Sequence, residues 1–475
     1  MFFSVCRWIM LPAFSFLMLV ENPMKNRILF YPCCFLLPVV GFLSPTRICG
    51  QVENAAVKKA RPNFVIIMAD DLGYGDIGCF GNRRIRTPHI DSIAARGIRF
   101  TDFHSSGTVC SPTRCGLMTG RYQQRAGIPA VVSVKHKHLG MPPSELTFAE
   151  VLKATGYATA IYGKWHLGYQ TRFNPVHQGF DEFRGYVSGN VDFFSHIDQA
   201  GAFDWWINDQ KKDEQGYSTH LITRHAVDFI KRRGDQPFCL YLAHEAPHYP
   251  YQGPGDSAER TVGGKFKTQG SRTDVADAYR EMVEAMDDGV GQVLRVLKEK
   301  GLDKNTLVWF FSDNGANQRG DNGGLRGFKG SVWEGGHRVP ACACWPGTIP
   351  AGKESAQLAT TLDVFPTITS LMQSADTRIP PLDGIDLSRT LFSGQDCKSQ
   401  REFFWGSGKQ RAMRDGQWKL VTQAKGQGNR TELFDLGRDR AEKQDMSGAE
   451  PDRVKKMLEA ISKWDQDVGP SSFSR

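Results

Sequence analysis

Short apolar runs that end in polar residues constrain the fold of this 475-residue chain more than any other feature. Each run is nearly continuous in apolar residues, which is typical of a strand buried on both faces of a parallel sheet. The four clearest runs are Asn63–Ala69, Tyr157–Tyr162, Phe238–Ala243 and Thr306–Phe311. Helix patterns lie between them. This alternation predicts an α/β fold, with a large mixed, mostly parallel sheet sandwiched by helices.

The expected helices carry start and stop signals. Ser144 is a candidate cap for a helix that ends before Gly156. Residues 274–300 form the longest helical pattern, with Gly301 as its stop. Further helices are expected at 89–96 and 219–232, and a further strand at 99–104.

The character of the chain changes near residue 380. Three short strands separated by glycines are expected at 402–405, 418–422 and 432–434, followed by a helix at 451–464. We therefore expect a main domain at 51–390 and a small C-terminal subdomain at 391–475, made of an antiparallel sheet plus one helix.

The first fifty residues have a composition of their own. Met24-Lys25-Asn26-Arg27 precedes the apolar run 28–43, as the charged start and apolar middle of a signal peptide do. Two short membrane helices are the alternative, but both apolar runs are short and contain proline. Residues 1–50 are therefore predicted to be a signal peptide with an N-terminal extension, removed by cleavage near Gly50. The mature protein would be secreted or periplasmic, or lysosomal in a eukaryote, with no integral membrane domain.

Charge and cysteine content exclude some classes of function. The formal net charge is +8, without a dense Lys/Arg stripe, so no nucleic-acid partner is expected. Seven cysteines follow residue 50, and they could form disulfides or remain free buried thiols. No CxxC pair is present, which argues against a zinc site.

The pentapeptide Cys110-Ser-Pro-Thr-Arg114 is the most informative motif. A helix that begins near Pro112 would point its free N–H groups back toward residue 110 and place Arg114 on its first turn. Such a pocket holds a nucleophile beside a tetrahedral anion. The alternative is a buried cysteine in front of an ordinary helix.

Other polar residues follow the apolar strands, and the carboxyl ends of parallel strands meet at one edge of a sheet. This rule predicts that seven side chains lie close together: Asp70, Asp71, Lys164, His166, His248, Asp313 and Asn314. The acidic and amide groups among them offer oxygen ligands only, a set that suits Ca²⁺ or Mg²⁺.

Two long motifs resemble the signatures of the sulfatase family, the formylglycine-dependent, arylsulfatase-like branch of the alkaline phosphatase superfamily. One is the run from Cys110 through Leu117-Met-Thr-Gly-Arg121, and the other is 156–166. The resemblance implies that a formylglycine-generating maturation enzyme oxidises Cys110 to Cα-formylglycine. One hydroxyl of the hydrated aldehyde would attack sulfur, and the second would let the enzyme expel sulfate. It also implies one divalent cation, Ca²⁺ or alternatively Mg²⁺, that touches modified Cys110. Its protein ligands would be Asp70, Asp71, Asp313 and Asn314.

The resemblance also implies roles for the cations and histidines. Arg114 would fix the diol, while Lys164 and Lys329, the latter in the glycine-rich loop 325–330, would bind sulfate oxygens. His166 would take a proton from the second hydroxyl. His248, together with Lys329, would bind the ester or protonate the leaving oxygen. No role is expected for His177, His196, His220, His244 or His337.

The predicted function is hydrolysis of a sulfate monoester, on a sulfated carbohydrate or alternatively an aryl sulfate. A phosphoester or phosphonate hydrolase of the same superfamily and a catalytically silent glycan-binding relative remain alternatives. The polar and aromatic stretch 188–196, with Trp205 and Trp206, could form a sugar-binding face or an ordinary folded loop.

Overall fold

The computed structural model describes residues 61–374, 376–396, 401–425 and 428–473. It also describes two strands, β1 (Trp8–Met10) and β2 (Phe16–Met18), which pair antiparallel within a separate compact unit, Met1–Arg47. Most of the expected signal peptide and its cleavage site lie outside the described residues. The remainder, Ile48–Arg475, forms the second unit. This division does not test a boundary near residue 390, which stays a prediction.

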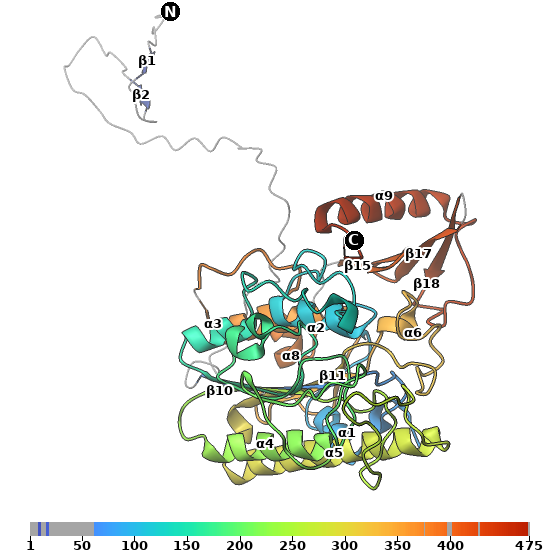
Figure 1. Cartoon of the computed structure of the whole chain (residues 1–475). Helices are drawn as coiled ribbons and strands as arrows, with labels where there is room; N and C mark the ends of the chain where they lie inside the picture. Colours follow the sequence, from blue (N-terminus) through green and yellow to red (C-terminus); the bar gives the residue numbers. More distant parts are fainter. Residues whose placement is uncertain are drawn as a thin grey trace, which may run out of the picture. The chain divides into compact units, whose positions relative to one another are not determined.

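A ten-stranded sheet forms the centre of the second unit (Figure 1). Its strand order is β13-β4-β12-β11-β3-β10-β6-β7-β8-β9. The central strands β11, β3, β10, β6 and β7 are parallel, whereas β12 and β8 pair antiparallel with their neighbours. The bounds in chain order are β3 Asn63–Ala69, β4 Ile98–Phe100, β6 Ala158–Lys164, β7 Glu182–Tyr186, β8 Trp206–Ile207, β9 Gln210–Lys211, β10 Phe238–Ala243, β11 Thr306–Ser312, β12 Ala341–Cys344 and β13 Lys353–Ser355. The mixed, mostly parallel sheet predicted from the apolar runs is confirmed.

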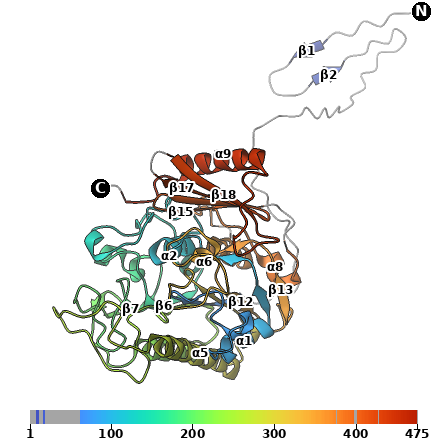
Figure 2. The ribbon, with the colours of Figure 1, turned by 90° about the vertical axis from the view of Figure 1, so that its right-hand side faces the viewer.

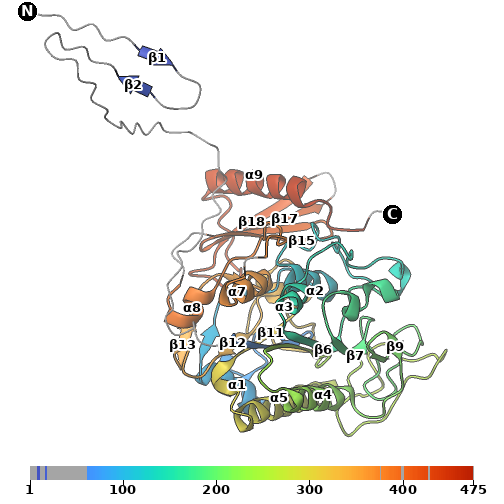
Figure 3. The ribbon, with the colours of Figure 1, turned by 90° about the vertical axis from the view of Figure 1, so that its left-hand side faces the viewer.

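Helices cover both faces of this sheet (Figure 3). One face carries α1 (Pro88–Ala95), α4 (Ser218–Arg232) and α5 (Val275–Glu299), and the other carries α2 (Cys110–Thr119), α3 (Phe148–Ala154), α7 (Val364–Leu371) and α8 (Ser388–Ser393). Side chains of β3 alternate between the two cores, because successive residues of a strand point to opposite faces. Val65 and Ile67 pack in the core with α4 and α5, whereas Ile66 and Met68 pack in the core with α2 and α3.

The C-terminal residues form a four-stranded antiparallel sheet in the order β15-β16-β17-β18, followed by α9 (Pro451–Val468). The strands are Glu402–Ser407, Gln410–Asp415, Trp418–Lys425 and Gly428–Asp435. One face of the sheet packs on the main domain, where Trp405 shares a core with Tyr122 and Leu362. The other face packs on α9 through Leu420 and Ile461. The predicted antiparallel sheet and helix are confirmed.

Shorter elements complete the described structure. β5 (Phe103–His104) pairs with β14 (Ala359–Thr360), and α6 spans Glu334–His337. Single 3-10 turns occupy Gly78–Phe80, Val134–His136, Thr171–Phe173, Pro175–His177, Asp303–Asn305 and Thr361–Asp363.

Several local predictions need correction. The expected strand 99–104 is divided between β4 and β5, which belong to different sheets. Ser144 is not a helix cap, because Thr147 accepts the Glu150 N–H while the Glu150 carboxylate accepts the Thr147 N–H, a capping box that starts α3 at Phe148. α2 begins at Cys110 instead of Pro112.

The cysteines favour the free-thiol alternative. Six described cysteines are free: Cys79, Cys110, Cys115, Cys239, Cys342 and Cys344. Cys397 lies outside the described residues.

Candidate active site

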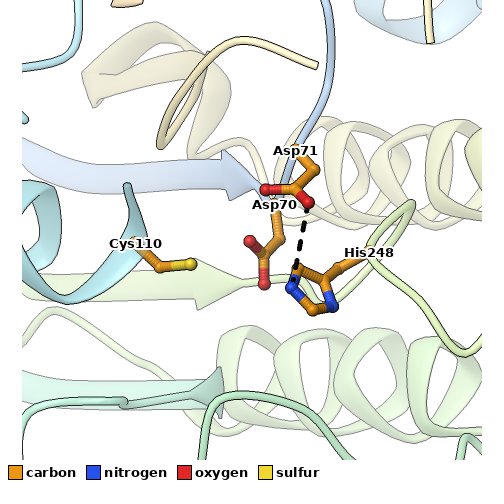
Figure 4. A group of neighbouring side chains, drawn as sticks. All are labelled: Asp70, Asp71, Cys110 and His248. Carbon is orange, nitrogen blue, oxygen red and sulfur yellow. Dashed lines mark ion pairs between the residues drawn. The ribbon is translucent and has the colours of Figure 1, made fainter. Parts of the chain in front are cut away.

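Four polar side chains meet where strands β3 and β10 end and helix α2 begins (Figure 4). Asp70 and Asp71 follow β3, Cys110 is the first residue of α2, and His248 follows β10. One ligand atom from each lies within 4.8 Å of the others, and all four residues are buried. In Figure 4 the Cys110 thiol points toward the Asp70 carboxylate, and the dashed line joins His248 to Asp71. The structure thus brings together residues that are up to 178 positions apart in the sequence.

Three cations pair with three aspartates at this edge. Lys164 Nζ, at the end of β6, lies 2.5 Å from Asp70 Oδ2. Arg114 donates Nε and Nη2 to Asp313 Oδ2, which follows β11, at 3.2 and 2.9 Å. Lys329 Nζ lies 2.6 Å from Asp71 Oδ1. Lys164 and Arg114 are almost fully buried, whereas 19% of the Lys329 side chain is exposed, so Lys329 adjoins solvent at this site.

The start of α2 explains the place of the thiol. Val109 is the extended N-cap, so Cys110 is the first residue of the helix, at its positive end, and Arg114 lies one turn later. Arg114 also donates Nη1 to the Lys164 carbonyl at 3.0 Å, which ties α2 to the end of β6. Burial raises the pKa of the Cys110 thiol, although Lys164 and Lys329 oppose that shift. The unmodified residue is therefore a neutral thiol, which is a poor nucleophile.

The acidic and amide groups fit a hard cation. Asp70 Oδ1 and Asn314 Oδ1 are buried, and neither has a hydrogen-bond partner within the described ranges. Asp71 has a left-handed backbone, with φ 65°, which its N–H to Asp313 Oδ1 helps to hold. Asn314 and Asn317 each donate Nδ2 to the Asp71 carboxylate, at 2.7 and 3.2 Å. Buried oxygen atoms without partners are costly, and a divalent cation would satisfy them.

The electrostatics of the aspartates agree with that fit. Burial alone would raise the pKa of Asp71, but Lys329 and His248 hold it below its ordinary value. Burial and the neighbouring Asp70 carboxylate raise the pKa of Asp313 to about 6. Like charges are therefore crowded at this edge, and positive charge stabilises them.

Each of the two histidines is fixed in one tautomer by a carbonyl, which can only accept a hydrogen bond. His166 Nε2 lies 3.1 Å from the Val132 carbonyl, so its bare Nδ1 is the basic atom. That Nδ1 is buried, and no described residue is its partner. His248 Nδ1 lies 2.7 Å from the Tyr249 carbonyl, which leaves Nε2 toward Asp71, at 3.8 Å. Burial lowers the pKa of both well below 6.5, with help from Lys164 for His166 and from Lys329 for His248.

Sequence reasoning missed several neighbours of the site. Asn317 contacts Asp71, and Tyr249 packs its ring 4.1 Å from the ring of His248. Glu245 is fully buried, and burial raises its pKa well above 4.5. Tyr249 directly follows His248, Glu245 lies three positions before it, and Asn317 lies three positions after Asn314. This closeness in the sequence to predicted site residues was the available signal.

The stretch 188–196 is folded as a loop that its own hydrogen bonds hold in place. The Asp192 carboxylate accepts four backbone N–H groups, from Phe194, Ser195, Glu259 and Arg260. Trp205 is fully buried and stacks on His196 at 4.2 Å. Trp205 and His196 are therefore held by packing, whereas Phe194 and Ser195 are half-buried and line a surface hollow, so a sugar-binding role for this stretch stays a prediction.

At the carboxyl edge of the parallel sheet, a cysteine at the start of a helix lies with three buried aspartates and three cations. This arrangement is typical of a hydrolase that cleaves esters of tetrahedral oxyanions. The family model described as Sulfatase matches residues 62–374. The chain belongs to the sulfatase family, and the protein is a sulfuric ester hydrolase.

Known relatives agree with this assignment. The chain is 34% identical to mouse N-acetylgalactosamine-6-sulfatase over 82% of this chain and 76% of that protein. It is 34% identical to human arylsulfatase A over 84% of this chain and 86% of that protein. Among solved structures, Ps i-CgsB in complex with k-i-k-neocarrahexaose aligns with a TM-score of 0.77 and 30% identity, covering 87% of this chain and 94% of that one.

Proposed function

We propose that this sulfatase removes sulfate from a carbohydrate through Cys110 oxidised to Cα-formylglycine, with one divalent cation, Ca²⁺ in preference to Mg²⁺. The observation that carries the proposal is the buried Cys110 thiol at the start of α2, clustered with Asp70, Asp71 and His248. A relative named for a sulfated amino sugar and a similar structure in complex with a neocarrahexaose support a carbohydrate, while the relative named arylsulfatase A keeps an aryl sulfate as the alternative.

Asp70, Asp71, Asp313 and Asn314 would hold the cation, together with the modified residue 110. A bound divalent ion supplies positive charge that polarises a sulfate oxygen and lowers the pKa of an attacking hydroxyl. A maturation enzyme would oxidise Cys110, and the hydrated aldehyde supplies the two hydroxyl groups that the chemistry requires. The residues of the chain bind the substrate, orient it and move protons.

Lys164 and Lys329 would bind and orient the sulfate group, and Arg114 would hold the modified residue. Lys329 is partly exposed and reaches the incoming ester, while Lys164 and Arg114 lie deeper. Lysine acts as a compact point charge and arginine as a planar fork, so Arg114 is suited to hold the modified residue in one orientation.

Two histidines would divide the proton transfers. His166 accepts a proton at its bare Nδ1, because Nε2 is held by the Val132 carbonyl. His248, once protonated at Nε2, would donate that proton to the leaving oxygen, since its Nδ1–H is held by the Tyr249 carbonyl. The negative sulfate offsets Lys329, which otherwise disfavours the protonated form of His248.

The first fifty residues predict the localisation of the protein. A signal peptide within residues 1–50 would direct it to the periplasm, the medium or, in a eukaryote, the lysosome. The mature chain would hold a catalytic domain at 51–390 and a subdomain at 391–475. In the part of the chain that the structure describes, no helix has both the length and the apolar character of a bilayer span.

The test is a panel of defined esters: sulfated mono- and oligosaccharides, an aryl sulfate, a phosphate monoester and a phosphonate ester. The protein is produced together with a formylglycine-generating enzyme, and the released sulfate and phosphate are measured separately, with the Cys110→Ala variant as the blank. We expect sulfate release from one or more sugars that the variant lacks. Faster release of phosphate or phosphonate would favour the alternative hydrolase. Binding of sulfated sugars without turnover would favour a catalytically silent protein.

A further inference from the structure

Lys329 lies on a long segment outside the helices and strands of the sheet domain. All of residues 313–333 are described, and none belongs to a helix or strand. Gly327 and Gly330 have left-handed backbones, with φ values of 82° and 87°, which glycine adopts without strain. Ordering such a chain has a cost in backbone entropy at every residue. The precise contact between Lys329 and Asp71 therefore depends on hydrogen bonds within the segment and on support from outside it.

The main domain supplies part of that support. The Gly330 N–H donates to the Thr108 carbonyl at 2.8 Å, and within the segment itself the Lys329 N–H donates to the Ala316 carbonyl at 2.9 Å. These two bonds fix the N–H side of the lysine segment. The carbonyl side of Gly330 points to the C-terminal sheet.

Ser407, the last residue of β15, binds the carbonyl group of Gly330. Its hydroxyl donates to the Gly330 carbonyl at 2.8 Å. Thr108 and Ser407 thus hold Gly330, the residue after Lys329, from two different parts of the molecule.

Glu442, in the loop after β18, holds the segment on both sides of the lysine. Its backbone carbonyl accepts Arg326 Nη1 at 3.0 Å, and its carboxylate Oε2 accepts the Glu334 N–H at 2.7 Å. Glu442 is buried and has a left-handed backbone, with φ 54°. For a residue other than glycine, such a conformation is strained and persists only where the surroundings impose it.

A buried ion pair fixes Glu442 in turn. Lys419 Nζ, from β17, lies 2.8 Å from Glu442 Oε1 and 2.9 Å from Glu334 Oε1. The Arg326 guanidinium lies 3.5 Å over the Trp333 ring, and Trp333 packs edge-on against Phe434 of β18. Figures 1 and 2 both place α6, which begins at Glu334, beside this sheet. Contacts from β15, β17, β18 and the loop after β18 therefore converge on residues 326–334.

We propose that Glu442 and Ser407 are positioning residues for Lys329, so that the C-terminal sheet is part of the sulfate-binding machinery. This inference rests on the proposed role of Lys329. Neither residue touches the substrate. They act by holding the lysine ammonium where the sulfate group is bound.

The kinetic test compares Glu442→Ala, Glu442→Gln, Ser407→Ala and a control, Arg411→Ala. Arg411 pairs with Asp465 at 2.6 Å and joins β16 to α9 in the same subdomain. We expect kcat/KM to fall roughly tenfold in Glu442→Ala and several-fold in Ser407→Ala, since small displacements of a binding group reduce rates by up to about a hundredfold. Glu442→Gln keeps an acceptor for the Glu334 N–H and should recover most of the loss. Arg411→Ala should stay within about twofold of the parent.

A local readout separates positioning from general loosening. Hydrogen exchange at the Lys329 and Gly330 amides should be faster in Glu442→Ala and Ser407→Ala and unchanged in Arg411→Ala. Unchanged exchange in both variants, or equal acceleration in the control, would overturn the inference. If Glu442→Ala does not fold, Ser407→Ala alone tests the inference, because this substitution removes only one hydroxyl group and should leave the protein folded.

A double variant separates this inference from the proposed function. Lys329→Ala with Ser407→Ala should be no slower than Lys329→Ala alone, because a positioning residue has nothing to position once the lysine is removed. Independent, multiplying losses would overturn the positioning role. Parent-level kcat/KM in Lys329→Ala would instead refute the role of the lysine itself. A slow Lys329→Ala beside a normal Ser407→Ala and Glu442→Ala would leave the lysine assigned and reject only the positioning.

Discussion

Removal of the divalent cation should lower the melting temperature of this protein, because the site crowds three aspartates into one buried edge. Two of its oxygen atoms, Asp70 Oδ1 and Asn314 Oδ1, lack partners in the described structure, and the pKa of Asp313 is raised to about 6 by burial and by Asp70. An ion that binds only the folded state at 100 times its Kd stabilises that state by about 2.7 kcal/mol. At about 2.1 cal/mol/K per residue, the unit Ile48–Arg475 has an unfolding entropy of roughly 0.9 kcal/mol/K. The expected increase in melting temperature is therefore about 3 °C.

The assay is a thermal melt of chelated protein with Ca²⁺ or Mg²⁺ added back over a concentration series. We expect a larger shift with Ca²⁺, and little or no shift in Asp70→Asn and Asp313→Asn. The matched control is Asp287→Asn. Asp287 is a buried carboxylate of α5 that accepts the His89 and Ile90 N–H groups, so this variant should melt lower yet keep the Ca²⁺ increment. A metal-independent melt in the parent, or the same increment in Asp70→Asn, would refute the assignment of these ligands.

Three further outcomes follow from the same contacts. Cys110→Ala should abolish sulfate release and leave the circular dichroism spectrum unchanged, and retained activity would exclude residue 110 as the source of the nucleophile. Arg114→Ala should destabilise the metal-free protein by about 3–5 kcal/mol in urea, because Asp313 Oδ2 loses two charged N–H donors in a buried site, and a parent-like midpoint would show that this pair does not stabilise the fold. Burial lowers the pKa of His196 from 6.5 to about 4, so between these pH values the unfolded state is protonated at this histidine and the folded state is not. The free energy of unfolding therefore falls by up to about 1.4 kcal/mol per pH unit as the pH is lowered from 6.5 to 4. His196→Phe keeps a ring stacked on Trp205 and should flatten that acid limb in pH-dependent urea unfolding, whereas an unchanged slope would contradict the buried neutral state of His196.

The central sheet could be predicted from the sequence because its strands are buried on both faces. The runs 63–69 and 238–243 match β3 and β10 residue for residue, and β11 extends one residue further than expected. Strands without that signature were missed. β7 includes Glu182 and Arg184, and β16 reads Gln-Arg-Ala-Met-Arg-Asp, so neither resembles a buried strand. Their pairing partners, not their own composition, make them strands.

The candidate site, like the fold, could be predicted from the sequence only in part. The rule that ligands gather at the carboxyl edge of a parallel sheet placed Asp70, Lys164 and Asp313 together correctly. It could not find Ser407 or Glu442, because they reach the Lys329 segment from another sheet, and nothing local in the sequence records that contact. His337, to which no role was assigned, is likewise buried between His104 and Lys419, at 2.9 and 3.2 Å. Long-range contacts of this kind depend on how the two sheets pack.

The most direct test of the account is mass spectrometry of the tryptic peptide Phe100–Arg114 from catalytically active protein. We predict that residue 110 carries an aldehyde in place of its thiol, and that the fraction of converted peptide across preparations is proportional to the rate of sulfate release. Full turnover by protein whose Cys110 is an intact thiol would contradict the account.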